Sequence, residues 1–307
     1  MTRFSLLALL SLSTALVACN SQGDPQDGAR SSEPPPNLAR SALIYSGLSA
    51  PERVLYDAQR DRYLVSNVNG EPAADDNNGF ISVLSPDGTI SQLRWIEGGQ
   101  GDTTLNAPKG LAIVGNVLYV ADLDVLRSFD VETGAALGEI GLPGSTFLNG
   151  VSATSEGRLY VSDSGPPQGT LDAFGTETVY VVEPDTNRIR KLASRPLGRP
   201  TSVQATQDGV LTAAFATNEI FHLDGQGKKG VTSVLPAGGL AGIAQIGDWL
   251  YVTSWQASAI FRGRLGGTFE VALGDLKSPS DLGFDTQRQR LLVPNFTEDK
   301  VEVVELR

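Results

Sequence analysis

The stretch LNAPKGLAIVGNVLYVAD, residues 105–122, decides the fold. It reads as a turn, an apolar strand, a Gly-Asn turn and a second apolar strand that ends on a carboxylate. Two apolar runs joined by a short turn that contains Gly are typical of a β-hairpin. The same order of turn, strand, turn and strand returns five more times, beginning at Ala50, Phe147, Gly198, Gly238 and Lys277.

The six copies predict a repeat architecture. If they share residues 40–307, each copy takes about 45 residues, and one four-stranded blade of a β-propeller takes about 40–50. Each copy is followed by further apolar runs, with turn residues such as Pro86-Asp87-Gly88 between them. No sustained 3.6-residue apolar period, which would indicate helices, follows the N-terminal segment. We therefore expect an all-β fold, a six-bladed β-propeller that forms one domain over residues 40–307.

The last copy is short by one strand, because the chain ends at Arg307 soon after the run VEVVEL. A suitable run, SALIYSG at residues 41–47, is present at the other end of the propeller region. Exposed edge strands invite aggregation, and closing the ring would remove two of them. We expect this N-terminal strand to complete the last blade.

The N-terminus carries a targeting pattern. Arg3 precedes the apolar run at residues 4–18, which is too short to span a bilayer of about 30 Å comfortably, and the run ends in Leu16-Val17-Ala18-Cys19. This pattern resembles the bacterial lipoprotein signal. The resemblance implies that residues 1–18 are a signal peptide and that Cys19 is lipidated, and more than one acyl chain gives stable membrane anchoring. It also implies a cell-envelope location, with Asn20 favouring the outer membrane on its periplasmic side.

Composition limits the partners and the chemistry. Residues 19–39 are rich in Pro, Gly, Ser and Asp, which predicts a flexible tether. Cys19 is the only cysteine, so a disulfide and a catalytic thiolate are excluded, and the single His222 excludes a two-His metal motif. The net charge is −11 and Lys and Arg do not cluster, which argues against a nucleic-acid partner. We expect a monomer that binds the membrane through its lipid.

Two columns of equivalent positions are expected to meet around the central channel. The column before the first strand of each copy holds Glu52, Lys109, Asn149, Thr201, Ala241 and Ser280, with Asp281 beside the last. The column at the end of the second strand holds Asn67, Asp122, Asp163, Phe215, Ser254 and Asn295, with Trp255 adjacent. Ligand sites combine apolar walls with a few convergent polar groups. We therefore predict a binding site at the channel mouth, with ligand contacts from Asn67, Trp255 and Asn295.

Five short motifs carry a resemblance to a known family. They are PERVLYD at 51–57, NAPKGLA at 106–112, FLN at 147–149, YVSD at 160–163 and SPSDLGFD at 278–285. The sequences of these motifs resemble those of the gluconolactonase and regucalcin family of six-bladed propellers, most closely its members from the bacterial envelope. The resemblance covers residues 50–306.

The resemblance implies a divalent cation, usually calcium, at the channel mouth. In the family a Glu at the start of the first blade, Asn residues of middle blades and an Asp further on hold the ion. Glu52 and Asn149 match this pattern, whereas Thr201 and Ala241 stand where the family has Asn and Asp. Asp281, one blade further on, would supply the missing carboxylate.

Two hypotheses about function stay open. In the first, Glu52, Asn149 and Asp281 hold calcium, which polarises a lactone or ester carbonyl. Asp163 or Asp122 would then be the general base, and Lys109 would stabilise the developing oxyanion or hold a carboxylate of the substrate. In the second, the tethered propeller uses the same mouth to bind a small ligand or a loop of a partner protein without chemistry.

Overall fold

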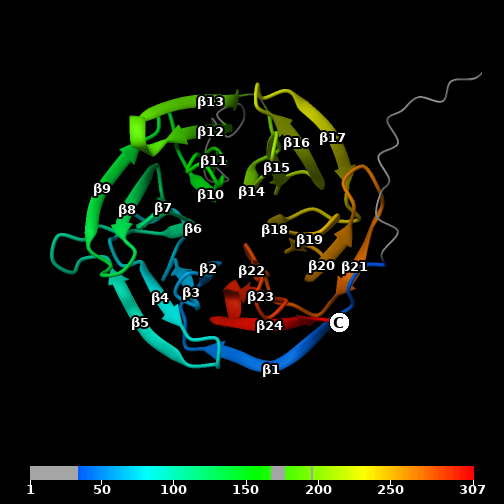
Figure 1. Ribbon diagram of the computed structural model, residues 1–307, viewed down its shortest axis with the longest axis horizontal. Helices are drawn as coiled ribbons and strands as arrows, with labels where there is room; N and C mark the ends of the chain where they lie inside the picture. The colour runs from blue at the N-terminus through cyan, green and yellow to red at the C-terminus, as the bar shows by residue number, and fades with distance from the viewer. Residues whose placement is uncertain (1–33, 167–176, 195) are drawn as a thin grey trace, which may run out of the picture. The chain divides into compact units, whose positions relative to one another are not determined.

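The computed structural model describes residues 34–166, 177–194 and 196–307 of the chain. Within the compact unit Pro34–Arg307, the strands form six antiparallel sheets of four strands each. Figure 1 shows these sheets as blades around a central axis, with β2, β6, β10, β14, β18 and β22 innermost. The predicted all-β, six-bladed propeller is therefore confirmed. The predicted signal peptide and Cys19 lie outside the described residues.

In blades 1 to 3 the strands run outward from the axis in chain order. Blade 1 contains β2 (Pro51–Asp57), β3 (Arg62–Asn67), β4 (Phe80–Leu84) and β5 (Ile90–Glu97). Blade 2 contains β6 (Pro108–Val114), β7 (Val117–Asp122), β8 (Val125–Asp130) and β9 (Ala136–Gly141). Blade 3 contains β10 (Leu148–Ala153), β11 (Leu159–Asp163), β12 (Thr178–Glu183) and β13 (Arg188–Ser194).

Blades 4 and 5 repeat this order, and blade 6 differs only in its outermost strand. Blade 4 contains β14 (Pro200–Ala205), β15 (Gly209–Ala214), β16 (Glu219–Asp224) and β17 (Lys229–Val234). Blade 5 contains β18 (Leu240–Ile246), β19 (Trp249–Ser254), β20 (Ala259–Gly263) and β21 (Phe269–Leu273). Blade 6 contains β22 (Gly283–Asp285), β23 (Arg290–Asn295), β24 (Lys300–Leu306) and β1 (Leu38–Ser46). Two short 3-10 helices, Pro184–Thr186 and Phe296–Glu298, are the helical segments of the described residues.

The ring is closed by the N-terminal strand, as the sequence predicted. Strand β1 pairs with β24 from Leu38 opposite Leu306 to Ser46 opposite Lys300. It begins two residues before the predicted boundary at residue 40. No helix in the described part of the chain is long and apolar enough to cross a membrane.

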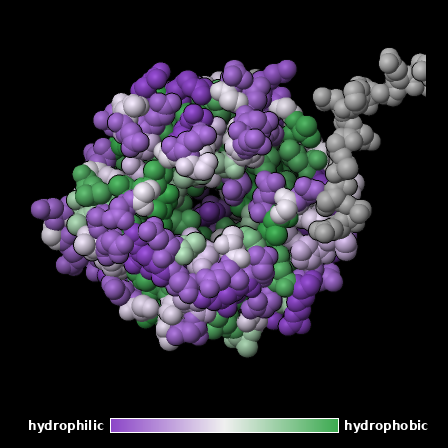
Figure 2. All heavy atoms as spheres, in the orientation of Figure 1, coloured by the Kyte–Doolittle hydropathy of each residue, from purple (hydrophilic) through white to green (hydrophobic). Residues whose placement is uncertain are grey.

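The hydrophobic core lies between neighbouring blades. Leu64 and Ile81 of blade 1, for example, pack with Leu111 and Val120 of blade 2, and all four side chains are buried. Each buried side chain of this size stabilises the fold by about 1.5–3 kcal/mol. The packing holds the inner strands in fixed positions around the axis, and Figure 2 shows that the face in view is hollowed at the centre of the ring.

Candidate functional site

The first predicted column reaches the axis because the inner strands are irregular at their starts. In blade 2, Pro108 pairs with Asp122 but regular pairing resumes only at Leu111, and blades 1, 3, 4 and 5 show the same shift. A bulge of this kind re-aims the side chain that it contains. Lys109 and its equivalents in the other four blades, Glu52, Asn149, Thr201 and Ala241, therefore face a common pocket.

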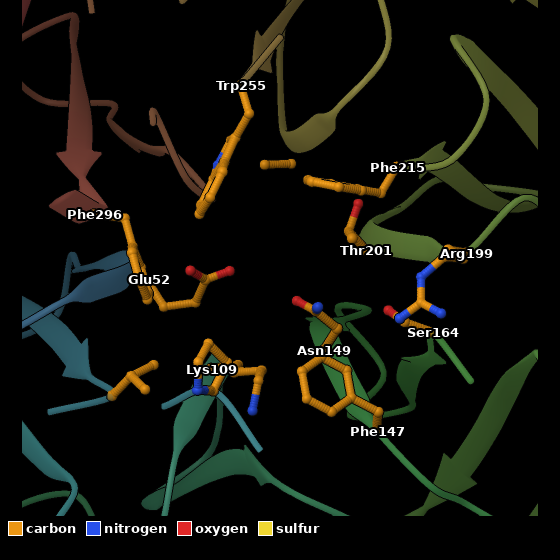
Figure 3. Close-up of a pocket in the computed structure, with 13 residues that line it drawn as sticks. Glu52, Lys109, Phe147, Asn149, Ser164, Arg199, Thr201, Phe215, Trp255 and Phe296 are labelled. Carbon is orange, nitrogen blue, oxygen red and sulfur yellow. The ribbon is translucent and has the colours of Figure 1, made fainter. Parts of the chain in front are cut away.

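This pocket has a volume of about 220 Å³. The rest of its lining is Val68, Pro72, Phe147, Ser164, Arg199, Phe215, Trp255 and Phe296. Figure 3 shows the carboxylate of Glu52 and the amide of Asn149 pointing toward one another across its centre. Side chains from blades 1 to 6 thus meet in one place at the axis.

One side of the pocket is an aromatic wall, formed by Phe215, Trp255 and Phe296. The Trp255 ring lies 6.0 Å from Phe215, edge to face, and 5.5 Å from Phe296 in a tilted arrangement. Aromatic pairs at such distances stabilise each other beyond their buried area. The Trp255 indole nitrogen is buried and has no hydrogen-bond partner among the described residues. The wall is therefore rigid and carries one unused donor.

The other side holds a carboxyl group and an ammonium group that shift each other's pKa. Burial raises the pKa of Glu52 to about 7, a shift that Lys109 opposes and Asp281 adds to. Burial lowers the pKa of Lys109 to about 8, against the charges of Glu52 and Asp122. The Lys109 ammonium donates to the Ala107 carbonyl at 2.8 Å and lies 4.3 Å from the centre of the Phe147 ring. An acid and a base with pKa values close to neutrality are characteristic of functional sites.

The second predicted column lies outside this lining. Asn67, Asp122, Asp163 and Asn295 are fully buried, and each accepts hydrogen bonds from backbone N–H groups of the loop before its blade. Asp122 also forms an ion pair with Arg127. These side chains hold the loops, so the geometry gives Asp122 and Asp163 no access to a ligand in the pocket, and Asn67 and Asn295 no contact with it. Trp255 alone of the predicted ligand contacts lines the pocket.

The register also corrects the fourth member of the second column, Phe215. In blade 4 the residue that pairs with Pro200 is Ala214, so Phe215 lies one position further on. The equivalents of Phe215 are Val68, Leu123, Ser164, Trp255 and Phe296, and all of them except Leu123 line the pocket. The residues near the second column that line the pocket are thus those directly after the second strand of a blade, one position beyond the predicted column.

Asp281 lies one step deeper along the channel than Glu52, because Ser280 is the true equivalent of Glu52 in blade 6. Its carboxylate pairs with the Arg53 guanidinium at 2.7 Å and accepts from the Ser202 hydroxyl at 3.0 Å. We call Arg53, Ser202 and Asp281 the floor cluster. Burial raises the pKa of Asp281, while Arg53 lowers it. Arg53 lines two further hollows along the inner strands but is not part of the lining of the pocket.

No protein-family model matches the chain, and no curated protein matches it. Among solved structures, a gluconolactonase from Xanthomonas campestris has a TM-score of 0.66 at 15% identity, with 90% of this chain and 96% of that chain covered. A putative gluconolactonase has a TM-score of 0.64 at 16% identity, with 89% of this chain and 92% of that chain covered. Virginiamycin B lyase from Staphylococcus aureus has a TM-score of 0.62 at 14% identity, with 88% of this chain and 100% of that chain covered. The chain has the fold of the gluconolactonase-like propellers.

The mouth of this propeller does not fit a calcium ion. Calcium takes six to eight oxygen ligands, several of them from carboxylates. The pocket offers one carboxylate, Glu52, and one amide oxygen, Asn149, while Asp281 is held by Arg53 and Ser202. The Lys109 ammonium beside Glu52 would repel a cation, and the described residues contain no cluster of three acidic, His or Cys side chains.

We expect the stability of this gluconolactonase-like propeller to depend on pH through Glu52. Its pKa is about 7 when folded against an ordinary value of 4.5, so the folded state holds the proton more tightly. The free energy of unfolding should therefore fall as the pH rises from 4.5 to 7. Lys109 is charged in both states across this range. Glu52→Gln should remove roughly 1–2 kcal/mol of this pH dependence.

Urea unfolding of the parent and of Glu52→Gln, followed at half-unit steps of pH, measures this effect. Glu156→Gln, at an exposed position outside the pocket, is the matched control and should keep the parent's pH dependence. Parallel curves for the parent and Glu52→Gln would contradict the burial of the Glu52 charge.

Proposed function

We propose that the protein is an envelope propeller, anchored by lipid at Cys19, that binds a small amphipathic organic molecule at its channel mouth. The pocket carries this proposal, because the aromatic wall faces Glu52, Lys109 and Asn149 across one space. Ligand sites are mostly apolar, with a few polar groups that fix orientation. Since drug-sized ligands occupy about 300–1,000 Å³, the volume of about 220 Å³ favours a smaller molecule.

The geometry gives such a ligand two kinds of contact. A ring or short chain would pack on Trp255 and Phe296, where each Å² of apolar area removed from water stabilises the complex by about 25 cal/mol. A hydroxyl or amide of the ligand would meet the free amide of Asn149 and the carboxyl of Glu52. Because these groups come from different blades and sit on bulges of the inner strands, they are pre-positioned and lose little entropy on binding.

A blocking variant tests this proposal. Calorimetric titration with small ring compounds should give dissociation constants for the parent that weaken at least tenfold in Ala241→Leu, because Ala241 lines the pocket and a larger side chain fills it. Ala136→Leu, on the exposed edge strand β9, is the matched control and should bind as the parent does. Equal affinities in the parent and in Ala241→Leu would refute the site.

A second candidate function is hydrolysis of a lactone or ester in the same pocket, and the near-neutral pKa of Glu52 favours it. A carboxylate with this pKa would take a proton from an attacking water, and Lys109 would stabilise the oxyanion. Hydrolysis assays on a panel of small lactones, with and without added calcium, test it. Activity that Glu52→Gln abolishes would support the hydrolase, and activity that appears only with calcium would support the metal site implied by the family resemblance.

Lipid anchoring is proposed from residues 16–19, whose sequence Leu-Val-Ala-Cys follows an apolar run. The anchor would keep the pocket at the membrane surface, in the periplasm if Asn20 directs sorting. Expressed in a bacterium, the parent should fractionate with membranes and incorporate labelled palmitate. Cys19→Ser should do neither, whereas Ser21→Ala, in the same tether, should behave as the parent does. Membrane association of unlabelled Cys19→Ser would count against the anchor.

A further inference from the structure

The pocket is positively charged in a protein that is strongly negative. Its lining holds two cations, Lys109 and Arg199, and one carboxyl group, Glu52, whereas the whole chain has a net charge of −11. Glu52 and Lys109 each stabilise the charged form of the other. Among the residues that line the pocket, no further carboxyl group is present for Arg199.

The Arg199 side chain is held in place by a hydrogen bond to a backbone carbonyl. Its residue adopts a left-handed backbone conformation with φ of 60°, and Nη1 donates to the Pro166 carbonyl at 2.8 Å. It forms no ion pair with any carboxylate of the described residues. Burial lowers the pKa of Arg199, against the charges of Glu177 and Asp163. A guanidinium has five N–H donors, and one hydrogen bond to the described residues leaves donors for a ligand.

The two nearest carboxylates are already used by the backbone. Asp163 accepts from the N–H groups of Thr146, Phe147 and Gly165 at 2.9–3.0 Å. Glu177 accepts from the Leu197 N–H at 3.1 Å. Both carboxylates are thus engaged by backbone N–H groups, and no carboxylate of the described residues pairs with the guanidinium.

Arg199 lies at the far side of the pocket from Phe296. Figure 3 shows the guanidinium beside Ser164 at one end, with Trp255 and Phe296 at the other and Asn149 between them. A molecule whose ring rests on Trp255 and Phe296 would therefore extend its other end toward Arg199. Guanidinium groups match the planar geometry of a carboxylate through two parallel hydrogen bonds.

We propose that the pocket selects organic monoanions: a ring that packs on the aromatic wall and one carboxylate that binds Arg199. This inference rests on the proposed function and names the chemical class of its ligand. A hydroxyl on the ring would donate to Glu52. Lys109 supports the selection, because its ammonium has donors left beyond the one bond to Ala107.

Three probes of one shape test the charge preference by calorimetry: 4-hydroxybenzoate, 4-hydroxybenzamide and 4-hydroxybenzylamine. We expect the benzoate to bind at least tenfold more tightly than the neutral amide, and the cationic amine most weakly. The preference for the benzoate should shrink as salt is added, because ions screen the partly exposed Arg199.

Variants of Arg199 assign the preference to this side chain. Arg199→Gln should weaken the benzoate at least tenfold and bring it to about the affinity of the amide, and Arg199→Lys should keep part of the preference. Arg188→Gln makes the same change in net charge at an exposed position on β13 and should bind as the parent does.

The outcomes separate this inference from the proposed function. Equal binding of all three probes in the parent, weakened by Ala241→Leu, would overturn the charge preference and leave the pocket as a ligand site. A benzoate preference that survives in Arg199→Gln would also overturn it. If none of the probes binds the parent, both the inference and the small-ligand function fail for ring compounds of this size.

Discussion

Asp122→Ala should lower the free energy of unfolding by about 3–5 kcal/mol, the range for a buried ion pair that loses one partner. The Asp122 carboxylate is fully buried and accepts from the N–H groups of Asn106 and Ala107 at 3.0 and 2.7 Å. It also pairs with Arg127. Without it, two backbone donors and a guanidinium lose their acceptor inside the protein. Chemical denaturation measures the loss.

The same experiment decides between the structural and the catalytic reading of Asp122. Asp124→Ala, two residues along the chain and exposed, is the matched control and should change stability by less than about 0.5 kcal/mol. If Asp122→Ala kept the parent's stability but abolished hydrolysis of a lactone, the general-base role predicted from the sequence would stand. We expect the reverse.

Gly110→Ala should destabilise the protein by about 3 kcal/mol, at the upper end of the cost of overpacking. A Cβ at this position would lie 2.3 Å from the Asn149 carbonyl oxygen and 2.5 Å from the Val151 nitrogen, both on β10 of the next blade. Backbone atoms within a sheet cannot move aside as a flexible side chain can. The two inner strands would have to separate next to the pocket.

Gly141→Ala is the matched control for this prediction. A Cβ at Gly141, on the outer strand β9 of the same blade, would have no atom within 4 Å. Its stability should stay within about 0.5 kcal/mol of the parent's in the same thermal or urea unfolding experiment. A Gly110→Ala variant that unfolds with the parent's midpoint would show that neighbouring blades can shift apart at the channel.

Sequence periodicity predicts the fold well because hairpins are local. Alternating apolar runs, Gly-containing turns and a constant period are enough to define blades, and the missing strand of blade 6 pointed to β1. The first column was also predictable: Glu52, Lys109 and Asn149 share one place in the repeat and meet in the pocket.

The remaining residues of the site depend on register, which periodicity does not determine. A bulge adds one residue to a strand, so the side chains after it point to the opposite face of the sheet. The sequence does not mark the residue at which regular pairing resumes. Asp281 was therefore assigned to the pocket although its carboxylate belongs to the floor cluster. The two columns do not include Arg199, which precedes Thr201 of the first column by two residues, or Phe296, which follows Asn295 of the second column by one.

The closing strand has a mechanical consequence. Any tension on the chain segment before Pro34 enters the ring through β1, and the pairs at Asn37–Arg307 and Leu38–Leu306 receive it first. Because β1 pairs antiparallel with β24 and the load enters at the Leu38 end of this ladder, it would break the hydrogen bonds between the two strands one after another. Arg40 resists this opening, since it pairs with Glu302 and donates to the Gly274 and Asp275 carbonyls of the loop after blade 5. In a protein tethered at its N-terminus, the load would thus fall on the outer edge of blade 6 and not on the inner strands that form the pocket at the axis.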